Sequence, residues 1–224
     1  MVPKVKICCI SSIEEARMAI AHGADAIGLV GHMPSGPGVI SEELIAEIAA
    51  SVDGVETFLL TSETDAEQIV AHHSKVRTTA IQIVDQLTSG THREIKNELP
   101  DVTVVQVVHV VDESSVEEAL LASETADVVL LDSGNANLEV KELGGTGRTH
   151  NWGLSRKIVE ACAKPVFLAG GLSPDNVAGA VVSVNPFGVD LCSGVRTDGV
   201  LDERKLVAFV GAIGIRRLGK EQGI

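Results

Sequence analysis

Cys8 and Asp132 are the two residues whose types and positions could carry acid–base chemistry in this chain. Each stands at the end of a short run rich in Val, Ile and Leu. Side chains alternate along a strand, so Lys6 shares a face with Cys8, and Leu130 shares one with Asp132. A thiolate beside a cation such as Lys6 can remove a proton from carbon, and a carboxylic acid can protonate a leaving oxygen. This pair indicates proton-transfer chemistry.

Each of these residues also has a purely structural interpretation. A cysteine is often a small buried hydrophobe, and an aspartate often caps a helix or loop. Cys9 has the alternation that points away from Cys8, so we expect it to pack against the surrounding helices. His109 lies inside an apolar run and is expected to be a hydrogen-bonded core histidine.

Glycine-rich segments follow three consecutive apolar runs in the second half of the chain. Glycine lets backbone N–H groups approach phosphate oxygens, and the start of the following helix adds a favourable dipole. One such segment would be an ordinary turn, but three at corresponding strand ends predict a phosphate site. The predicted phosphate-binding residues are Gly145, Thr146, Gly147, Gly170, Gly171, Ser193 and Gly194.

The elements that must position these residues form one repeating pattern. Short apolar runs alternate with segments of helical periodicity from end to end. The predicted strands span residues 5–10, 26–30, 56–60, 80–84, 103–110, 128–132, 165–169 and 189–193. The predicted helices span residues 12–22, 41–52, 65–76, 90–99, 115–124, 154–163, 174–184 and 202–218.

Eight strand-then-helix units predict an α/β fold, a single (β/α)₈ TIM barrel spanning residues 1–224. An open doubly wound sheet is the alternative, but it usually has fewer units and one early glycine-rich turn. In a barrel the loops after the strands form the active face. That arrangement would place Cys8, Asp132 and the glycine segments around one mouth, together with the long loop 134–151.

Composition excludes several other functions. A net charge of −13 and an aromatic content of 2% oppose nucleic-acid binding. No run is long and apolar enough for a membrane helix. The four cysteines match no zinc or disulfide pattern, and the seven histidines show no ligand spacing, so we expect no metal and a reducing, cytoplasmic location.

Five motifs occur in an order and spacing that cover nearly the whole chain. They are Val5-Lys6-Ile7-Cys8, Leu130-Leu131-Asp132-Ser133, Gly144-Gly145-Thr146-Gly147 followed by Trp152, Leu168-Ala169-Gly170-Gly171-Leu172 with Pro174 and Asn176-Val177, and Gly188-Val189-Asp190 with Ser193-Gly194-Val195. In this order they resemble the phosphoribosylanthranilate isomerase family, most specifically in the second half.

The resemblance implies an aldose–ketose isomerase that performs an Amadori rearrangement in tryptophan biosynthesis, without metal or organic cofactor. It implies that Asp132 is the general acid toward the furanose ring oxygen and that Cys8 is the general base toward the proton on C2′. The phosphate of the small-molecule substrate would bind at the glycine segments. We expect a monomer or a homodimer.

The first half departs from the family pattern. Cys9 stands where the family usually has glycine, and the loop 34–38 lacks the arginine that meets the anthranilate group. The fourth strand ends in Gln82-Ile83-Val84-Asp85 rather than Gln-Leu-His-Gly, and Arg196 replaces a common acidic residue. A missing guanidinium removes a bidentate partner for a carboxylate. The predicted substrate-pocket residues are Lys6, His32, Asp85, Arg148 and Arg196.

These departures leave three functions open. The first is phosphoribosylanthranilate isomerase itself. The second keeps the chemistry for a different phosphoribosyl amine or sugar phosphate, with an aglycone that lacks a carboxylate. The third is a non-catalytic protein that binds a phosphorylated ligand on the same scaffold.

Overall fold

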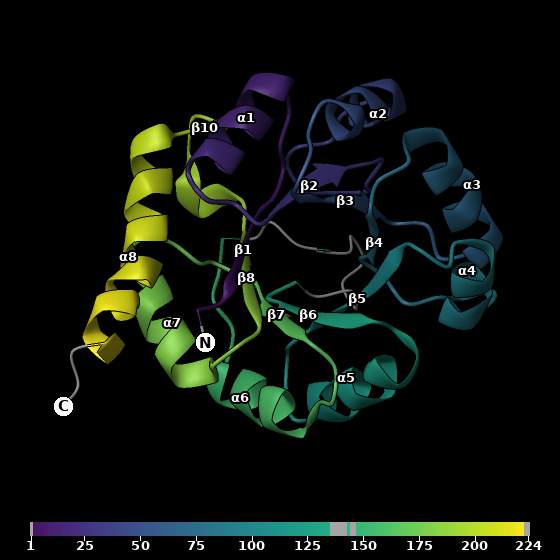
Figure 1. Ribbon diagram of the computed structural model, residues 1–224. Coiled ribbons are helices and arrows are strands. Elements are labelled where there is room, and N and C mark those ends of the chain that lie inside the picture. The colour runs from purple at the N-terminus through teal and green to yellow at the C-terminus, as the bar shows by residue number, and fades with distance from the viewer. Residues whose placement is uncertain (1, 135–142, 144–146, 222–224) are drawn as a thin grey trace.

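The computed structural model describes residues 2–134, 143 and 147–221, with side chains to residue 214, and it forms a closed barrel of eight parallel strands. Neighbouring strands follow the order of the sequence, and β1 pairs with β8 to close the ring. Figure 1 shows the helices arranged around the strands. The strands are β1 (Lys4–Ile7), β2 (Ala26–Val30), β3 (Glu56–Thr61), β4 (Ala80–Ile83), β5 (Thr103–His109), β6 (Val128–Asp132), β7 (Val166–Leu168) and β8 (Gly188–Leu191). The predicted (β/α)₈ barrel is confirmed.

The helices begin where the sequence offers an N-terminal cap. The hydroxyls of Ser12 and Ser41 accept hydrogen bonds from the backbone of the first turn, and the Asp65 carboxylate does the same. Such caps satisfy N–H groups that have no partner within the helix. The helices are α1 (Ile13–Ala21), α2 (Glu42–Ala50), α3 (Ala66–Val76), α4 (His92–Glu98), α5 (Ser114–Thr125), α6 (Trp152–Ala161), α7 (Val177–Val184) and α8 (Glu203–Glu221).

Helix α7 starts three residues later than the predicted Pro174 because Asn176 folds back onto the preceding loop. Its side-chain amide donates to the carbonyl oxygen of Gly171 at 2.9 Å, and its side-chain oxygen accepts from the backbone N–H of Ser173 at 2.9 Å. These bonds hold residues 173–176 as part of the loop after β7.

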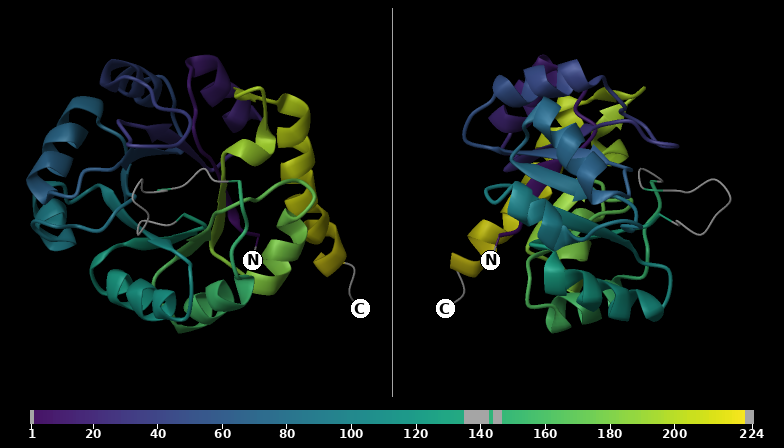
Figure 2. Two further views of the ribbon diagram at one scale, coloured as in Figure 1. Left: turned by 180° about the vertical axis from the view of Figure 1, so that it is seen from behind. Right: turned by 90° about the vertical axis from the view of Figure 1, so that its right-hand side faces the viewer.

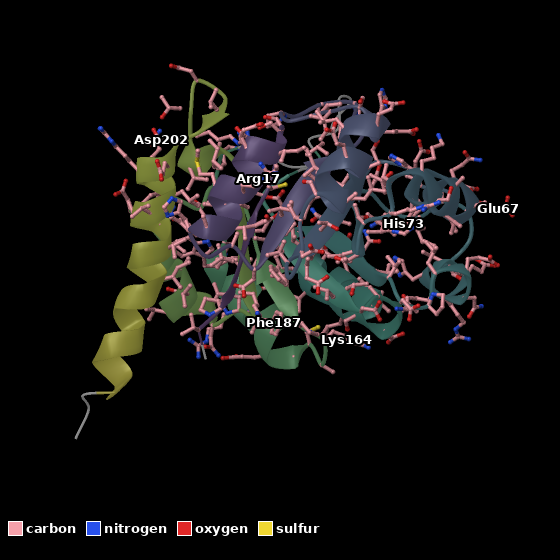
Figure 3. All side chains as sticks on the ribbon, turned by 45° about the horizontal axis from the view of Figure 1, so that its top comes forward. Arg17, Glu67, His73, Lys164, Phe187 and Asp202 are labelled. Carbon is pink, nitrogen blue, oxygen red and sulfur yellow. The ribbon has the colours of Figure 1, made fainter. Side chains whose placement is uncertain are left out.

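Strand alternation separates two apolar layers. Val128 and Leu130 of β6 pack inside the barrel, whereas Val129 and Leu131 pack against the surrounding helices. Polar side chains in the outer layer reach solvent, as Figure 3 shows for Glu67 on α3. Because Asp132 continues the inner set, its carboxyl group faces the barrel mouth. The alternation predicted from the sequence is confirmed for this strand.

A short hairpin and the last helix complete the ring. After the 3₁₀ turn η1 (Ser193–Val195), strands β9 (Arg196–Thr197) and β10 (Val200–Leu201) pair antiparallel before α8 begins. The imidazole of His22, after α1, lies 2.8 Å from Glu203 of α8. Figure 2 shows that the start of β1 and the last turn of α8 lie at the same end of the barrel. The described part of the chain contains no helix of the length and apolarity that a bilayer would require.

Aromatic rings from β3, β7 and the residue before β8 pack against one another. The rings of Phe58 and Phe167 meet edge to face at 6.4 Å, and Phe187 continues the contact at 5.7 Å from Phe167. A β-carbon on Gly188 would lie 2.3 Å from the Phe167 ring. Glycine at this position therefore makes room for the ring.

We expect Gly188→Ala to lower the free energy of unfolding by about 1–3 kcal/mol, because the added methyl group overpacks the barrel interior. Gly179→Ala is the matched control, since Gly179 is exposed on α7 and an added β-carbon meets nothing within 4 Å. That control should raise stability by up to about 1 kcal/mol through helix propensity. Urea denaturation measures both, and equal effects from the two substitutions would contradict the packing role of Gly188.

Candidate active site

The predicted acid–base pair meets in one pocket at the carboxyl ends of the strands. Cys8 follows β1, Asp132 ends β6, and both residues line this pocket. Leu143 and the loop segment 35–37 cover part of it, and Gln82 of β4 lies on its wall. Of the residues predicted from the sequence, the pocket lining contains Cys8, Asp132, Gly147, Gly170, Gly171 and Ser193.

The glycine segments after β6, β7 and β8 touch one another beside this pocket. A β-carbon on Gly170 would lie 2.9 Å from the hydroxyl oxygen of Ser133, and one on Gly171 would lie 2.5 Å from the Arg148 backbone. Both glycines have positive φ, at +80° and +60°. A β-carbon on Gly194 would lie 2.0 Å from the carbonyl oxygen of Leu172. Close approach of the three backbones therefore requires glycine.

Gly194 itself does not line the pocket but packs beneath it, and the predicted residues Gly145 and Thr146 lie outside the described residues. His150 approaches Gly170 from the loop after β6, at 3.0 Å from the position of its missing β-carbon. Burial lowers the pKa of His150 to about 4, so its imidazole is neutral at pH 7. His150 therefore offers no positive charge to an anion here, whereas backbone N–H groups and hydroxyls can bind one.

Lys6 and Asp190 form an ion pair inside the barrel, and Asp190 also lines the pocket. The ammonium nitrogen lies 3.0 Å from the carboxylate and is fully buried, and it also lies 5.1 Å from the centre of the Phe58 ring. Burial alone would lower the pKa of Lys6, but the Asp190 carboxylate and the Cys8 thiol outweigh it and raise the pKa. Lys6 therefore remains a cation.

This cation lies next to the Cys8 thiol. A β-carbon on Gly28 of β2 would lie 2.8 Å from the Cys8 sulfur and 3.1 Å from the Lys6 nitrogen. Both groups thus occupy the space that a side chain at this position would fill. An adjacent ammonium group stabilises a thiolate, which is the form of cysteine that accepts a proton. Lys6 belongs to the site, although it does not line the pocket.

Asp132 lies across the pocket in surroundings that favour its protonated form. Burial raises the pKa of Asp132, and the negative charge of Asp190 raises it further. The backbone N–H of Ser133, which donates to the Asp132 carboxylate at 2.7 Å, lowers this pKa. His109 also lowers it, by a smaller amount. A carboxyl group with a raised pKa is suited to donate a proton near neutral pH.

His109 faces the barrel interior two residues after Val107 on β5. Its Nε2 lies 3.1 Å from the carbonyl oxygen of Val84, and its Nδ1 has no hydrogen-bond partner within the described chain. The histidine expected to be hydrogen-bonded in the core thus uses only one of its two ring nitrogens for a hydrogen bond within the described chain. It lies beside Asp132, its register partner on β6.

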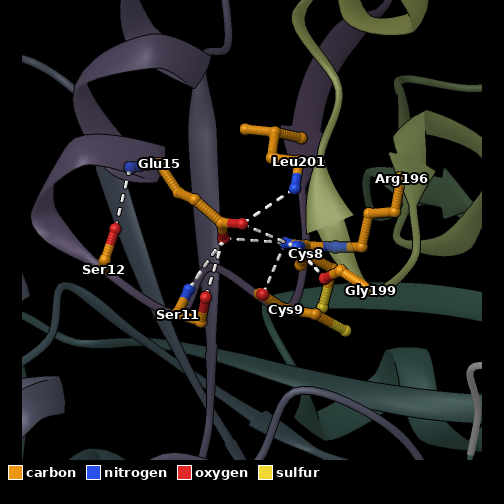
Figure 4. Close-up of polar contacts among 8 residues, drawn as sticks. All are labelled: Cys8, Cys9, Ser11, Ser12, Glu15, Arg196, Gly199 and Leu201. Carbon is orange, nitrogen blue, oxygen red and sulfur yellow. Dashed lines mark hydrogen bonds and ion pairs between the residues drawn. The ribbon is translucent and has the colours of Figure 1, made fainter.

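Arg196 is held in an internal network rather than directed at the pocket. Its guanidinium forms a two-pronged contact with Glu15, at 2.9 and 3.1 Å, and both side chains are nearly buried. It also donates to the carbonyl oxygens of Cys8 and Cys9 (Figure 4). Arg196 therefore holds the turn that carries Cys8, and its guanidinium is already occupied.

Cys9 does not pack against the helices as its alternation predicts. Its φ is +61°, a left-handed conformation that ends β1 at Ile7 and cancels the alternation beyond that point. The residue instead lines the pocket together with Cys8 and Cys192. The expectation of simple helix-layer packing is wrong because a positive φ redirects the side chain.

The remaining pocket candidates lie away from the two reacting groups. His32 borders a separate surface hollow with Glu42 and Lys75. Asp85 is buried past the end of β4, where its carboxylate accepts a hydrogen bond from the backbone N–H of Gln86 at 2.9 Å. Arg148 is exposed on the loop after β6. Neither these three residues nor Arg196 appear in the pocket lining.

Among the pocket residues to which the sequence assigned no role are Gln82, Asp190 and Cys192. Gln82 and Asp190 share the inward alternation of their strands, and an acid such as Asp190 inside an apolar run is a detectable signal. Among the described residues, no group of three or more His, Cys, Asp or Glu side chains is arranged to hold a metal ion.

Comparison with known proteins gives one consistent family. Residues 5–212 match the family model described as N-(5'phosphoribosyl)anthranilate (PRA) isomerase. A protein of Methanosarcina mazei named N-(5'-phosphoribosyl)anthranilate isomerase 2 is 33% identical over 210 residues, covering 92% of both chains. A Halorubrum lacusprofundi protein named N-(5'-phosphoribosyl)anthranilate isomerase is 35% identical over 214 residues, covering 94% of this chain and 96% of its own.

Solved structures agree with the sequence relatives. The crystal structure of phosphoribosyl anthranilate isomerase from Thermotoga maritima superposes with a TM-score of 0.77 at 29% identity, covering 94% of this chain and 98% of that one. A phosphoribosyl anthranilate isomerase in complex with reduced 1-(o-carboxyphenylamino)-1-deoxyribulose 5-phosphate superposes with a TM-score of 0.75 at 28% identity, with the same coverage.

We expect Glu15→Gln to lower the free energy of unfolding by about 3–5 kcal/mol, because it leaves the Arg196 guanidinium without its charged partner. Glu14→Gln, exposed on the same helix, is the control and should change stability by less than about 1 kcal/mol. Denaturant unfolding measures both variants. Equal effects would show that the ion pair does not stabilise the turn.

The same pair gives an expected pH dependence. Burial alone would raise the pKa of Glu15, but the Arg196 guanidinium and the backbone N–H groups of Leu201 and Ser11 outweigh it and lower the pKa. The stabilisation is therefore complete above the ordinary pKa of glutamate and is lost as pH falls through the lowered native value. Unfolding curves of the wild type and Glu15→Gln should converge on acidification, and a constant difference at all pH values would contradict this linkage.

Proposed function

Because the chain belongs to the N-(5'-phosphoribosyl)anthranilate isomerase family, we propose that it converts N-(5'-phosphoribosyl)anthranilate into 1-(o-carboxyphenylamino)-1-deoxyribulose 5-phosphate, a step of tryptophan biosynthesis. One observation supports this proposal above the others. A thiol beside a buried cation and a carboxyl group with a raised pKa line the same pocket, next to three converging glycine loops. This rearrangement requires one proton donor, one proton acceptor and a binding site for the substrate phosphate.

Asp132 supplies the first proton. Protonation of the furanose ring oxygen weakens its bond to the anomeric carbon, and the amine nitrogen assists by forming a Schiff base as the ring opens. The acid must be protonated before this step, which the raised pKa of Asp132 favours. Hydrogen bonding from the Ser133 backbone holds the carboxyl group in place at the end of β6.

Cys8 removes the second proton. The thiolate takes the proton from C2′ of the Schiff base, which gives an enolamine that tautomerises to the ketose. Lys6 stabilises the thiolate charge, and Asp190 keeps Lys6 protonated at the centre of the barrel. Arg196 holds the backbone carbonyl groups of Cys8 and Cys9 and thereby fixes where the sulfur stands.

The phosphate of the substrate binds at Gly147, Gly170, Gly171 and Ser193, with Gly194 supporting the β8 loop. Backbone N–H groups can bind an anion there, and because no side chain has to be ordered, binding loses no side-chain conformational entropy. A fixed phosphate orients the ribose between the base and the acid. Binding energy from a remote group is thus used to position the reacting carbon.

The aglycone end of the pocket supports a second candidate function. Within the described chain no arginine lines the pocket, the loop segment 35–37 contributes only Ser, Gly and Pro, and Arg196 is occupied by Glu15. A carboxylate-free aglycone would suit these surroundings better than anthranilate. The second candidate is therefore an isomerase for another phosphoribosyl amine, with the same acid and base.

The direct assay follows the loss of fluorescence of phosphoribosylanthranilate as the purified protein is added. Complementation of a tryptophan auxotroph that lacks this isomerase tests the same activity in a cell. Turnover in both assays supports the first candidate. Turnover of other phosphoribosyl amines alone favours the second, and ligand binding without any turnover would overturn both. We also propose a cytoplasmic location, since this reaction starts from a phosphorylated intermediate.

Cys8→Ser is expected to lower kcat by about 100- to 10,000-fold, because a hydroxyl group is a far weaker base than a thiolate. Phosphate binding should persist, since the glycine loops are untouched. Cys162→Ser, at the end of α6 and outside the pocket, is the matched control and should keep its rate. An unchanged rate in Cys8→Ser would remove this residue from the mechanism.

Asp132→Asn is expected to lower kcat by about 100- to 10,000-fold as well, because an amide keeps the shape of the side chain but cannot donate the proton. In the wild type, kcat should fall as pH rises through the raised pKa of Asp132. Asp190→Asn removes a charge that raises this pKa, so the alkaline decline should move to lower pH. A pH–rate profile measures the shift, and a shift to higher pH would be incompatible with this assignment.

A further inference from the structure

Three thiols gather at the closure of the barrel between β1 and β8. Cys8 and Cys9 follow β1, and Cys192 follows β8, whose last residue Leu191 pairs with Ile7. The backbone N–H of Cys8 donates to the carbonyl oxygen of Leu191 at 2.8 Å, so the ladder continues up to the cysteines. Paired strands lie about 5 Å apart, which is within the Cα separation of a disulfide.

The orientation of the sulfur atoms separates Cys8 from the other two. The Cys8 sulfur lies against Gly28 of β2, at 2.8 Å from the position of its missing β-carbon, and thus on the side of β1 away from β8. Cys9 and Cys192 line a hollow with Arg196 that does not include Cys8, and both also line the main pocket. Of the three cysteines at the barrel closure, Cys9 and Cys192 are therefore the two best placed to form a disulfide.

The backbone of Cys9 adds a second observation. Its φ of +61° is a conformation that glycine adopts freely and that costs another residue about 1 kcal/mol. Its β-carbon is also pressed against Gly38, where an added β-carbon would lie 2.5 Å away. A strained conformation that is kept beside an active site suggests that the side chain has a use there.

We propose that Cys9 and Cys192 are a peroxide-sensitive pair whose disulfide switches the isomerase off. Hydrogen peroxide is the oxidant. The Cys192 thiolate attacks one peroxide oxygen, the O–O bond breaks, and water leaves after protonation, so that sulfur loses two electrons and becomes a sulfenic acid. The Cys9 sulfur then attacks the Cys192 sulfur, the S–O bond breaks, and a second water leaves with the Cys9 proton.

The surroundings assign the two roles. The hydrogen bond from Cys9 and the Arg196 guanidinium lower the pKa of Cys192, although burial opposes them. Cys192 is also half-buried rather than enclosed, and it lines the open pocket, so a small oxidant can reach it. The hydrogen bonds to Cys192 and Cys8 and burial raise the pKa of Cys9, so Cys192 reacts with peroxide first. Oxidation of Cys192 removes the thiolate to which Cys9 donates, and Cys9 then loses its proton to the leaving hydroxide as it attacks.

The disulfide would act through the loops that it joins. Cys9 is adjacent to the general base, and Cys192 is adjacent to Ser193 of the phosphate site. A covalent bond across this wall of the pocket ties the turn that carries Cys8 to the loop that carries Ser193. The loss of activity depends on the proposed function, but formation of the disulfide does not.

The experiment uses the full chain, reduced with dithiothreitol, treated with hydrogen peroxide and then alkylated under denaturing conditions. Mass spectrometry should show the loss of two hydrogen atoms and a cross-link between the peptides that contain Cys9 and Cys192. Cys8→Ala should still form this cross-link, and so should the control Cys162→Ser. Cys9→Ala should not form it.

A cross-link in Cys9→Ala would overturn the assigned pair, and so would oxidation of Cys8 alone without a cross-link. In the wild type, we expect peroxide to lower kcat at least about tenfold and dithiothreitol to restore it. Peroxide should lower the kcat of Cys9→Gly, relative to its own untreated sample, by a smaller factor than that of the wild type. Dithiothreitol should restore a smaller share of the loss. A cross-link that forms without any change in the wild-type rate would overturn the switch.

Discussion

The ion pair between Lys6 and Asp190 is the interaction on which the site depends. Taking two charges out of water costs several kcal/mol, and their attraction seldom stabilises a fold better than apolar packing would. Here the pair lies between β1 and β8 at the centre of the barrel, next to Cys8 and within electrostatic reach of Asp132. Its cation lies beside the Cys8 sulfur, and its carboxylate contributes to the raised pKa of Asp132. One buried pair thus contacts the surroundings of both proposed reacting groups.

A second ion pair, Arg196 with Glu15, fixes the position of the base from outside the barrel. It holds the backbone carbonyl groups of the Cys8–Cys9 turn, and it links this turn to α1 and to the β9–β10 hairpin through Leu201. The two pairs act on different parts of Cys8. Lys6, paired with Asp190, lies beside its sulfur, and Arg196, paired with Glu15, holds its backbone carbonyl group.

The same turn explains how the proposed base and the proposed redox pair share one wall of the pocket. Closing the barrel requires β1 and β8 to pair, and their pairing brings Cys8, Cys9 and Cys192 into one neighbourhood. Sulfur chemistry there follows from position and charge. The Cys8 thiol, the proposed base, lies beside Lys6, while Cys9 and Cys192 line a hollow with Arg196.

The sequence by itself determined the barrel and most of the active face. Eight apolar runs that alternate with helical segments favour a barrel over an open doubly wound sheet, and period-two alternation places Cys8, Lys6 and Asp132 inside. Glycines at three strand ends marked the loops that converge on the pocket. These signals are local, because strand period, capping and glycine conformation act over a few residues.

Only the tertiary structure decided which charges meet. Asp190 became the partner of Lys6 because closure of the barrel sets the first strand against the last, across nearly the whole chain. The sequence predicted Arg196 as a substrate-binding residue, but in the fold its guanidinium forms an ion pair with Glu15. Cys9 left the predicted layer because a positive φ ended the alternation. Each outcome depends on a long-range contact or a single dihedral angle, which local pattern does not encode.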